Sequence, residues 1–502
     1  MESNTILRRL LATAIMVLAM PAVLLAQVPG KKALDHDSYD IWRSISARVL
    51  ANNGEWVAFV SGPREGDGVM TLRSIGGSAQ VGDVDRASGP RITPESEFLI
   101  FSIDPMFSVV VSLEKADADR DDMPKDSLGI IELSSAFSGG AISNDFFKVA
   151  RVQNWKVPAD EGAFLAYLLE PEEEADSASA GEEAEEETPA RGRRGGRPGA
   201  GGQEDEGPED RDKAEGDILV FRDLASGQET RFDDVTNYYF TDDGAWLVYT
   251  ASNEDGTADG VFAVSTDSGE ASPILTGEGE YRGVALADDG DQVAFLTNRD
   301  DWEADEPGLT LYHARLGAGE AQAVATEGTA GIPDGWWLPE NASPRFSDEG
   351  TRILFGTAPR PPEEDEDEDE EDPIQVDIWN WKDPLIQPMQ LVRADRERER
   401  TYQAYATTDD HRVVQLATLD IPEVDIAQGG EGDVSLATTT TMVKYGWYVS
   451  HDGTYVDFYL MDVATGEPEL IMEKSGARGS FSPDGNYLSW WDGADRNWMV
   501  MD

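Results

Sequence analysis

A short phrase recurs along this chain and constrains its fold more than any other feature. The clearest copy is residues 481–490, which read Phe-Ser-Pro-Asp-Gly-Asn-Tyr-Leu-Ser-Trp. An apolar residue leads into a turn, Asp-Gly supplies the positive φ that a tight turn needs, and the following residues alternate as in a half-buried strand. Four other copies place glycine at the same point of the phrase: 50–59, 240–249, 286–295 and 346–355. The phrase therefore predicts a hairpin that is repeated along the chain.

The spacing of the phrase predicts the architecture. Ser96 takes the glycine position in one further copy and Gly162 fills it in another, while His411 and Gly453 mark weaker copies. The glycine-equivalent positions are 54, 96, 162, 244, 290, 350, 411, 453 and 485, and the steps between them run from 32 to 82 residues. The shorter steps bracket the ~40–50 residues of a four-stranded propeller blade, and the longer ones contain insertions. We predict an all-β β-propeller with about seven or eight blades in the complete domain. A two-sheet sandwich is the alternative, but it does not require a recurring signature.

The N-terminal stretch has the layout of a secretory signal peptide. Arg8 and Arg9 precede an apolar run over 10–26, and the mature chain would begin near Gln27. The prediction is a signal peptide over 1–26 and a secreted or periplasmic protein that is not membrane-bound after cleavage. An uncleaved anchor helix is the alternative, because the run is near the lower length limit for a membrane span.

Two segments interrupt the repeat. Residues 170–216 are rich in Glu, Ala, Gly and Pro, and every residue from 363 to 372 is acidic. Neither can bury enough apolar surface to offset the entropy of ordering, so disordered inserts are predicted over 170–216 and 363–373. They divide the propeller into pieces at 27–169, 217–362 and 374–502.

Composition excludes several classes of partner and site. The chain has 99 acidic and 40 basic residues among 502, a formal charge of −59. Such a field repels nucleic acid and anionic membranes, so neither is predicted as a partner. Cysteine is absent, which excludes disulfides, thiolate zinc sites and a cysteine nucleophile.

Motifs for catalysis are missing as well. The chain has no Gly-x-Ser-x-Gly nucleophile elbow, no phosphate-binding loop and no His-Glu-x-x-His zinc motif. Of its four histidines, only His36 has a suggestive setting, between Asp35 and Asp37, and a capping or salt-bridge role is the better interpretation. We therefore predict no catalytic, cofactor-binding or metal-binding residue, and no cofactor.

Three segments resemble one protein family. Their matching residues lie at 35–43, 122–129 and 376–390, and the most specific is Trp-Asn-Trp-Lys-Asp-Pro at 379–384. These segments are similar to parts of large secreted bacterial peptidases of the prolyl oligopeptidase family, and the resemblance runs from about residue 34 to the C-terminus outside the inserts. It implies a β-propeller that precedes an α/β-hydrolase domain with a Ser-Asp-His triad and restricts that domain to short peptides.

The chain departs from the family because it ends at Asp502, where members would continue into the hydrolase domain. The expectation is the substrate-gating propeller of a serine peptidase, truncated and catalytically incomplete, with peptides and the missing hydrolase domain as partners. Whether the chain is an enzyme stays open. A stand-alone periplasmic propeller that binds or scaffolds is the alternative, and a glycosidase-like propeller is a weaker one. An unclosed propeller would also expose strand edges that promote aggregation.

Overall fold

The computed structural model describes most of the chain from Trp42 onward. The predicted signal peptide, His36, His451 and the acidic run at 363–372 lie outside the described residues. The described ranges are 42–75, 80–118, 122–138, 141–142, 146–171, 213–304, 307–361, 379–383, 385–440, 444–446, 453–493 and 495–502.

Antiparallel sheets follow one another along the chain, and within each sheet the strands pair in sequence order. We name the four-stranded units blades A to G and the three-stranded unit at the end the terminal sheet. Blade A comprises β1 (Ser44–Leu50), β2 (Trp56–Gly62), β3 (Val69–Ser74) and β4 (Val81–Asp85), and blade B comprises β5 (Ala87–Ile92), β6 (Phe98–Ile103), β7 (Ser127–Glu132) and β10 (Phe147–Ala150). Blade C comprises β11 (Val152–Lys156), β12 (Phe164–Leu169), β13 (Asp217–Asp223) and the first half of β14 (Glu229–Phe240). Blade D comprises the second half of β14, β15 (Trp246–Ala251), β16 (Gly260–Ser265) and β17 (Ala271–Thr276).

The later sheets repeat the pattern with one irregularity, a first strand of blade F that is split in two. Blade E comprises β18 (Tyr281–Leu286), β19 (Gln292–Thr297), β20 (Thr310–Arg315) and β21 (Gln322–Ala325). Blade F comprises the split first strand, β22 (Trp336–Trp337) with β23 (Arg345–Phe346), followed by β24 (Arg352–Pro359), β25 (Tyr402–Thr407) and β26 (Val413–Gln415). Blade G comprises β27 (Glu423–Ile426), β28 (Val434–Thr438), β29 (Val456–Asp462) and β30 (Pro468–Ser475), and the terminal sheet comprises β31 (Ser480–Phe481), β32 (Leu488–Asp492) and β33 (Asn497–Met501). The small hairpin of β8 (Phe137–Ser138) and β9 (Ala141–Ile142) lies beside β4.

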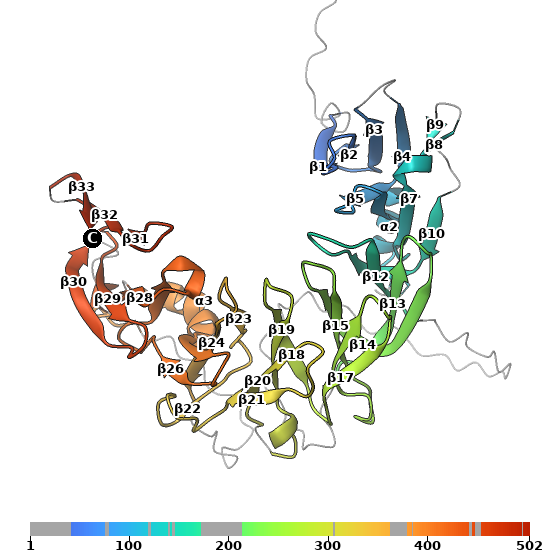
Figure 1. Cartoon of the computed structure of the whole chain (residues 1–502). Coiled ribbons are helices and arrows are strands. Elements are labelled where there is room, and N and C mark those ends of the chain that lie inside the picture. The colour runs from blue at the N-terminus through green and yellow to red at the C-terminus, as the bar shows by residue number, and fades with distance from the viewer. Residues whose placement is uncertain are drawn as a thin grey trace, which may run out of the picture.

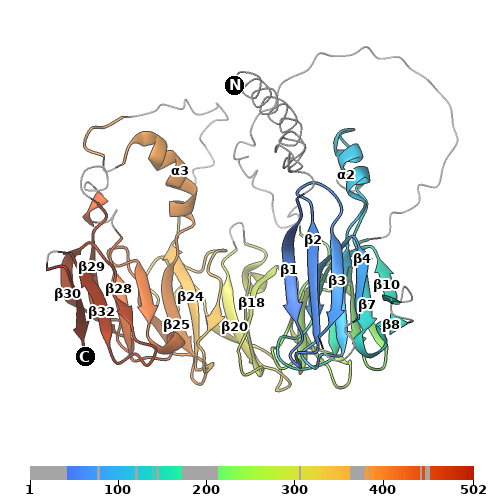
Figure 2. The same cartoon turned by 90° about the horizontal axis from the view of Figure 1, so that it is seen from above.

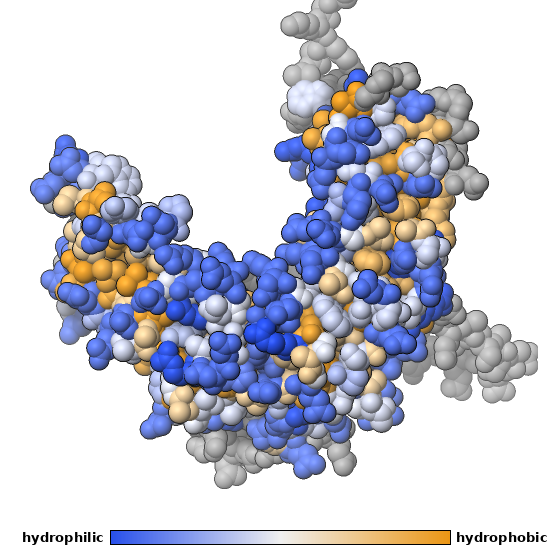
Figure 3. Space-filling model, in the orientation of Figure 1, coloured by the Kyte–Doolittle hydropathy of each residue, from blue (hydrophilic) through white to orange (hydrophobic). Residues whose placement is uncertain are grey.

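The sheets stand side by side around an arc, which confirms the predicted β-propeller (Figure 1). Fourth strands such as β17, β21 and β30 lie on the outer rim, whereas the first strands β1 and β31 lie on the inner side of the arc (Figure 1). Blade A and the terminal sheet lie at opposite ends, with an open gap between them in both the ribbon and the space-filling view (Figures 1 and 3).

The core lies at the junctions between sheets. In β19, Val293 and Phe295 belong to the apolar cluster shared with blade D, and Ala294 and Leu296 belong to the cluster shared with blade F. All four side chains are buried because the blade has a neighbour on each face. The prediction that the strand after each turn is half-buried was therefore wrong for β19. A strand covered on both faces takes a continuous apolar run instead of an alternating one.

The recurring phrase forms the turn between the first and second strands of a blade. In blade D the Thr241 hydroxyl accepts a bond from the Trp246 N–H (3.0 Å) and donates to Asp243 Oδ1 (2.6 Å), while the Gly244 N–H donates to the Thr241 carbonyl (2.9 Å). Gly244 has a φ of 67°, which side chains rarely adopt. The terminal sheet repeats the same bonds with Ser482, Asp484 and Gly485.

Seven of the nine predicted turn positions join a first strand to a second one: 54, 96, 162, 244, 290, 350 and 485. Ser96 adopts a φ of 63°, as its place in the phrase predicts. The two weaker copies lie elsewhere: His411 joins the third and fourth strands of blade F, and Gly453 lies between β28 and β29. The corresponding turn of blade G is the irregular 3-10 segment η4 (Gln428–Gly430), whose sequence lacks the phrase.

Two helices emerge from one face of the arc (Figure 2). They are α2 (Phe107–Glu114) and α3 (Gln387–Arg398), each in a connection between second and third strands. Both acidic inserts belong to connections of the same kind, in blades C and F. We call this side the insert face and the opposite side, which carries the recurring turns, the turn face. Sequence reasoning found neither helix.

Candidate functional site

The insert face carries apolar side chains that the propeller does not bury. Helix α2 has no buried residue although its sequence is Phe-Ser-Val-Val-Val-Ser-Leu-Glu, and Phe107 and Val109 are exposed. It is held at its start by the Phe107 N–H, which donates to Asp67 Oδ1 of blade A (2.8 Å). An apolar helix without a buried face is unusual for a surface element and is typical of a contact region.

Helix α3 repeats this arrangement with a basic character. It also has no buried residue, and Leu391 and Val392 are exposed, the latter at 79%. The segment before it, which carries the most specific part of the family resemblance, exposes Trp381 at 79%. Arg396 and Arg398 lie in its last turn, where cations stabilise the helix dipole. Both helices rise on the same side of the sheets (Figure 2).

Buried acidic residues hold the connections of this face in place. Asp259, whose side chain is fully buried, accepts bonds from Lys213 Nζ (3.0 Å), the Asn253 N–H and the Gly279 N–H. Lys213 is the first described residue after 171, and this ion pair attaches it to blade D. Lys213 lies within the insert predicted over 170–216, so that end of the predicted insert contacts the propeller.

A second buried carboxylate acts in blade G. Asp457 accepts bonds from Lys444 Nζ (2.5 Å), the Tyr445 hydroxyl (2.5 Å) and the Lys474 N–H (2.8 Å). Burial by itself would raise the pKa of Asp457, but these bonds lower it below its ordinary value and raise the pKa of Lys444. The carboxylate therefore stays ionised and fastens the connection between β28 and β29.

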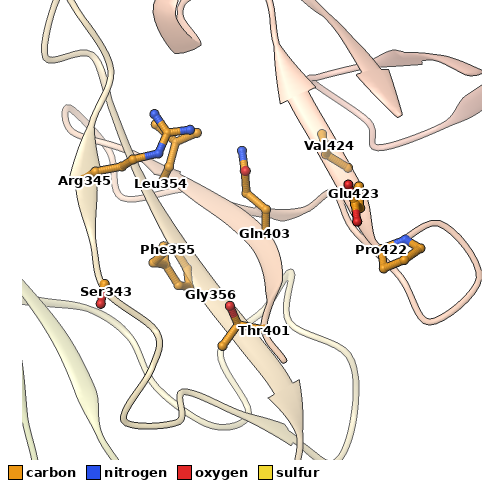
Figure 4. A pocket seen from close by; sticks show the side chains of 10 residues that line it. All are labelled: Ser343, Arg345, Leu354, Phe355, Gly356, Thr401, Gln403, Pro422, Glu423 and Val424. Carbon is orange, nitrogen blue, oxygen red and sulfur yellow. The ribbon is translucent and has the colours of Figure 1, made fainter. Parts of the chain in front are cut away.

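A cavity of about 280 Å³ lies between blades F and G (Figure 4). Polar side chains from both blades line it together with an apolar wall. The lining residues are Ser343, Arg345, Leu354, Phe355, Gly356, Thr401, Gln403, Pro422, Glu423 and Val424. The Gln403 side chain extends between Arg345 on one side and Glu423 on the other (Figure 4).

The split first strand of blade F makes room for this cavity. β22 pairs with the end of β24 and β23 with its start, so residues 338–344 leave the sheet between them. This stretch is Leu-Pro-Glu-Asn-Ala-Ser-Pro, and its two prolines cannot donate ladder hydrogen bonds. On the side of β22 and β23, the middle of β24 around Phe355 and Gly356 therefore has no paired strand, and this stretch forms part of the cavity wall.

The structure brings together His411, which sequence reasoning placed in a turn, and His313, to which it gave no role. His313 Nδ1 lies 3.1 Å from His411 Nε2, and His313 Nε2 lies 3.0 Å from Gln292 Oε1. Burial, together with the nearby His411 and Arg315, lowers the pKa of His313 to about 4. Its partners are a glutamine and a second imidazole rather than a serine and a carboxylate, so this pair has the contacts of a packing element between blades E and F.

Carboxylates of neighbouring turns crowd the turn face. Burial raises the pKa of Asp242, and the negative charges of Asp160, Asp288 and Asp243 raise it further. Within the described residues, no group of three or more histidine, aspartate or glutamate side chains is placed to hold a metal ion. Among the helices that the structure describes, none has the length and apolar character needed to cross a membrane.

Comparisons with known proteins returned structural likenesses only. No family model matches, and no curated protein matches by sequence. Similar solved structures include a eukaryotic initiation factor (9% identity, TM-score 0.41, covering 91% of this chain and 83% of that one). Prolyl oligopeptidase B from Galerina marginata shares 9% identity with a TM-score of 0.34 over 92% of this chain and 55% of its own. Tricorn protease shares 12% identity with a TM-score of 0.28 over 91% of this chain and 42% of its own. The chain thus spans about half the length of these two peptidases.

Proposed function

We propose that this chain is the β-propeller portion of a secreted serine peptidase of the prolyl oligopeptidase type, in which the blades control the access of peptides to a hydrolase domain. The observation that carries the proposal is the insert face, where two helices without buried residues present apolar side chains in the same direction. Such surfaces are typical of contacts with another domain. Of the family resemblance at 376–390, the described residues 379–383 and 385–390 lead into α3 and form its start on this face.

The residues of this chain would position the hydrolase domain and exclude large peptides from it. Helices α2 and α3 would hold the hydrolase domain over the insert face, and the inner strands would limit the size of peptide that reaches it. The buried ion pairs at Asp259 and Asp457 would keep the connections of this face in a fixed arrangement. Attack on the peptide bond by serine, with proton transfer by histidine, would belong to the hydrolase domain.

A serine-directed fluorophosphonate probe tests the proposal on the protein isolated from its source. We expect one polypeptide to carry both the probe and tryptic peptides of this sequence, and the purified 502-residue chain to stay unlabelled. The reading frame after codon 502 should encode Gly-x-Ser-x-Gly followed by Asp and His. An unlabelled native polypeptide with no such frame would contradict the proposal.

A second candidate is a stand-alone propeller that binds peptides in the periplasm. The cavity between blades F and G favours it, because this cavity is formed entirely by residues of the present chain. The same isolation experiment separates the two candidates, since a stand-alone protein would bind peptides and would have no serine that reacts with the probe.

A further inference from the structure

The first strands of the blades carry a charge opposite in sign to that of the whole chain. In a chain with 99 acidic and 40 basic residues, no first strand of blades A to F contains Asp or Glu, and five of these six strands contain one basic residue each. The basic residues are Arg48, Arg91, Lys156, Arg282 and Arg345. The exception is β27 of blade G, which contains Glu423 and Asp425. The distribution therefore separates the first strands of blades A to F from the acidic remainder of the chain.

These strands lie at the inner edges of their sheets. Fourth strands lie on the outer rim, and the strands of each sheet pair in sequence order, so the first strand is at the opposite edge (Figure 1). Blades B, C and F also have a neighbour on each face, so solvent reaches their first strands from the inner side of the arc or at the strand ends. Arg91 and Arg345 are exposed in this position, and Arg48 is exposed on blade A. The cations consequently border the space inside the arc.

Four of the five cations lie at one level of the arc. Arg91 and Arg345 directly precede the first residue of the recurring phrase in their blades, and Arg48 and Lys156 precede it by two residues. Equivalent residues of a repeat occupy equivalent places in each blade. The four side chains therefore start near the ends of the inner strands that lead to the turn face, and three of them come from the adjacent blades A, B and C.

The arginines of this level are available to a ligand. Arg48, Arg91 and Arg345 are exposed and form no ion pair with any described residue. Arg282 differs, because it is paired with both Glu280 and Glu340. We therefore leave Arg282 out of the site.

Lys156 adds positive charge beside this row without a carboxylate partner. Its Nζ donates to the Tyr238 carbonyl (2.5 Å) and lies 4.4 Å from the centre of the Tyr239 ring. Within the described part of the chain it forms no ion pair. The ammonium is half-buried, so it contributes to the positive potential of the row more than to direct contact.

Charge and strand geometry together indicate an acidic peptide as the ligand. A first strand is a sheet edge, so main-chain groups on its inner side have no neighbouring strand, and extended peptides bind such edges through their own main chain. Guanidinium groups match the two oxygens of a carboxylate. The many acidic residues elsewhere are screened beyond about 8–10 Å at physiological salt, so the nearest cations determine the potential that a peptide meets inside the arc.

We propose that the inner side of the arc binds peptides with acidic side chains, whose carboxylates lie along the row of Arg48, Arg91 and Lys156. Arg345 adds positive charge from blade F. The proposal rests on the proposed function for the choice of peptides as the ligand class. It deepens that function by naming the kind of peptide that the propeller admits.

Fluorescence anisotropy on the 502-residue chain tests the binding with two peptides that carry an uncharged fluorophore. They are N-acetyl-hexaglutamate amide and its glutamine counterpart, which has the same shape without the charge. We expect the glutamate peptide to bind at least tenfold more tightly and to lose affinity as NaCl is added. Equal binding of the two peptides would overturn the proposal. A thymidine hexanucleotide that competes as well as the glutamate peptide would also overturn it, because the site would then recognise negative charge alone.

Variants locate the binding on the inner strands. Arg91→Gln should weaken binding of the glutamate peptide about threefold, and adding Arg48→Gln should bring the loss to about tenfold, as expected for exposed charge pairs that act additively. Arg91→Lys keeps the charge and should bind the peptide nearly as well as the unchanged protein. The thermal unfolding midpoint should not change, because neither arginine has an ion-pair partner among the described residues.

The matched control is Arg73→Gln. Arg73 is also an exposed strand arginine without an ion pair to any described residue, but it lies on β3, the third strand of blade A. Its substitution should leave binding unchanged, and equal losses from Arg73→Gln and Arg91→Gln would contradict a site on the inner strands. No hydrolase domain takes part in these measurements. A chain that binds neither peptide, while the native polypeptide reacts with the fluorophosphonate probe, would therefore overturn this inference and leave the peptidase proposal intact.

Discussion

The imidazole rings of His313 and His411 bond to each other across the junction of blades E and F, although 98 residues separate them in the chain. The Gln292 amide donates to the Gly350 carbonyl through Nε2, so its Oε1 accepts a hydrogen bond from the His313 Nε2–H. His313 Nδ1 is then an acceptor, and His411 Nε2 donates to it. His313 is neutral in this arrangement, and its protonation would place two N–H groups face to face.

Acidification should therefore weaken the junction. The pKa of His313 is lowered from 6.5 to about 4 by burial, with His411 and Arg315 adding to the effect, so the unfolded chain binds the proton more readily. Stability should fall as the pH drops from about 6.5 toward 4, by up to about 3 kcal/mol. Burial also lowers the pKa of His411, partly opposed by Asp410. Urea unfolding at pH 7, 6 and 5 measures the free energy of unfolding, and His313→Gln should remove much of its pH dependence. An identical pH profile of the variant would exclude the pair as its source.

Two glycines of the recurring turn should respond differently to alanine. Gly54 and Gly244 have φ values of 71° and 67°, so both substitutions incur backbone strain of about 1–2 kcal/mol. A Cβ at Gly54 meets nothing within 4 Å, whereas one at Gly244 would lie 2.4 Å from the Glu161 carbonyl of blade C. We expect Gly244→Ala to be more destabilising than Gly54→Ala by about 1 kcal/mol or more, measured by chemical denaturation. Equal losses would show that the turns of blades C and D are not in close contact.

The end of the first insert can be located by two deletions. Removing 172–212, with a short Gly/Ser linker in its place, should leave cooperative unfolding almost unchanged. Extending the deletion to 216 removes Lys213 and leaves the buried Asp259 without its cation, which should cost about 3 kcal/mol. Thermal denaturation compares the two forms, and Lys213→Met in the full chain should reproduce most of the difference. A large loss from the shorter deletion would show that the insert itself packs.

The open ends of the arc should promote self-association. β33 is an edge strand, and its Trp498 is 69% exposed and lies opposite Trp491 on the same face of the terminal sheet. Apolar residues are visible over both ends of the arc in the space-filling view (Figure 3). Trp498→Lys should reduce oligomers in sedimentation velocity, because a charged edge resists strand pairing. The control is Trp381→Lys on the insert face, where Trp381 is 79% exposed; this change should have little effect on this assembly.

The repeated turns were predictable because their hydrogen bonds are local. Thr241, Asp243 and Gly244 satisfy one another within a few residues, so the same chemistry is visible as a sequence phrase in each blade. His411 illustrates the limit of this reasoning. It closes a turn with similar bonds, but that turn joins the third and fourth strands of blade F. A local sequence pattern does not show which strands of a blade the turn connects.

The helices and the cavity were harder to predict from the sequence than the turns. Val109 to Val111 in α2 form a β-branched run, which is typical of a strand and conceals the helix. For α3, the proline near its start and the arginines of its last turn were usable signals. The cavity has no comparable signal. Arg345, Gln403 and Glu423 come from three separate strands, and only the packing of blade F against blade G places them around one space.

Strand β14 belongs to two blades at once. It pairs with β13 from Glu229 to Val235 and with β15 from Val235 to Phe240, so Val235 takes part in both ladders. Neither blade C nor blade D can detach from the arc by releasing a loop, because a continuous hydrogen-bonded ladder runs through both. The pair forms one mechanical unit, and tension applied at either of its edges is carried across it by a sheet rather than by a flexible connection.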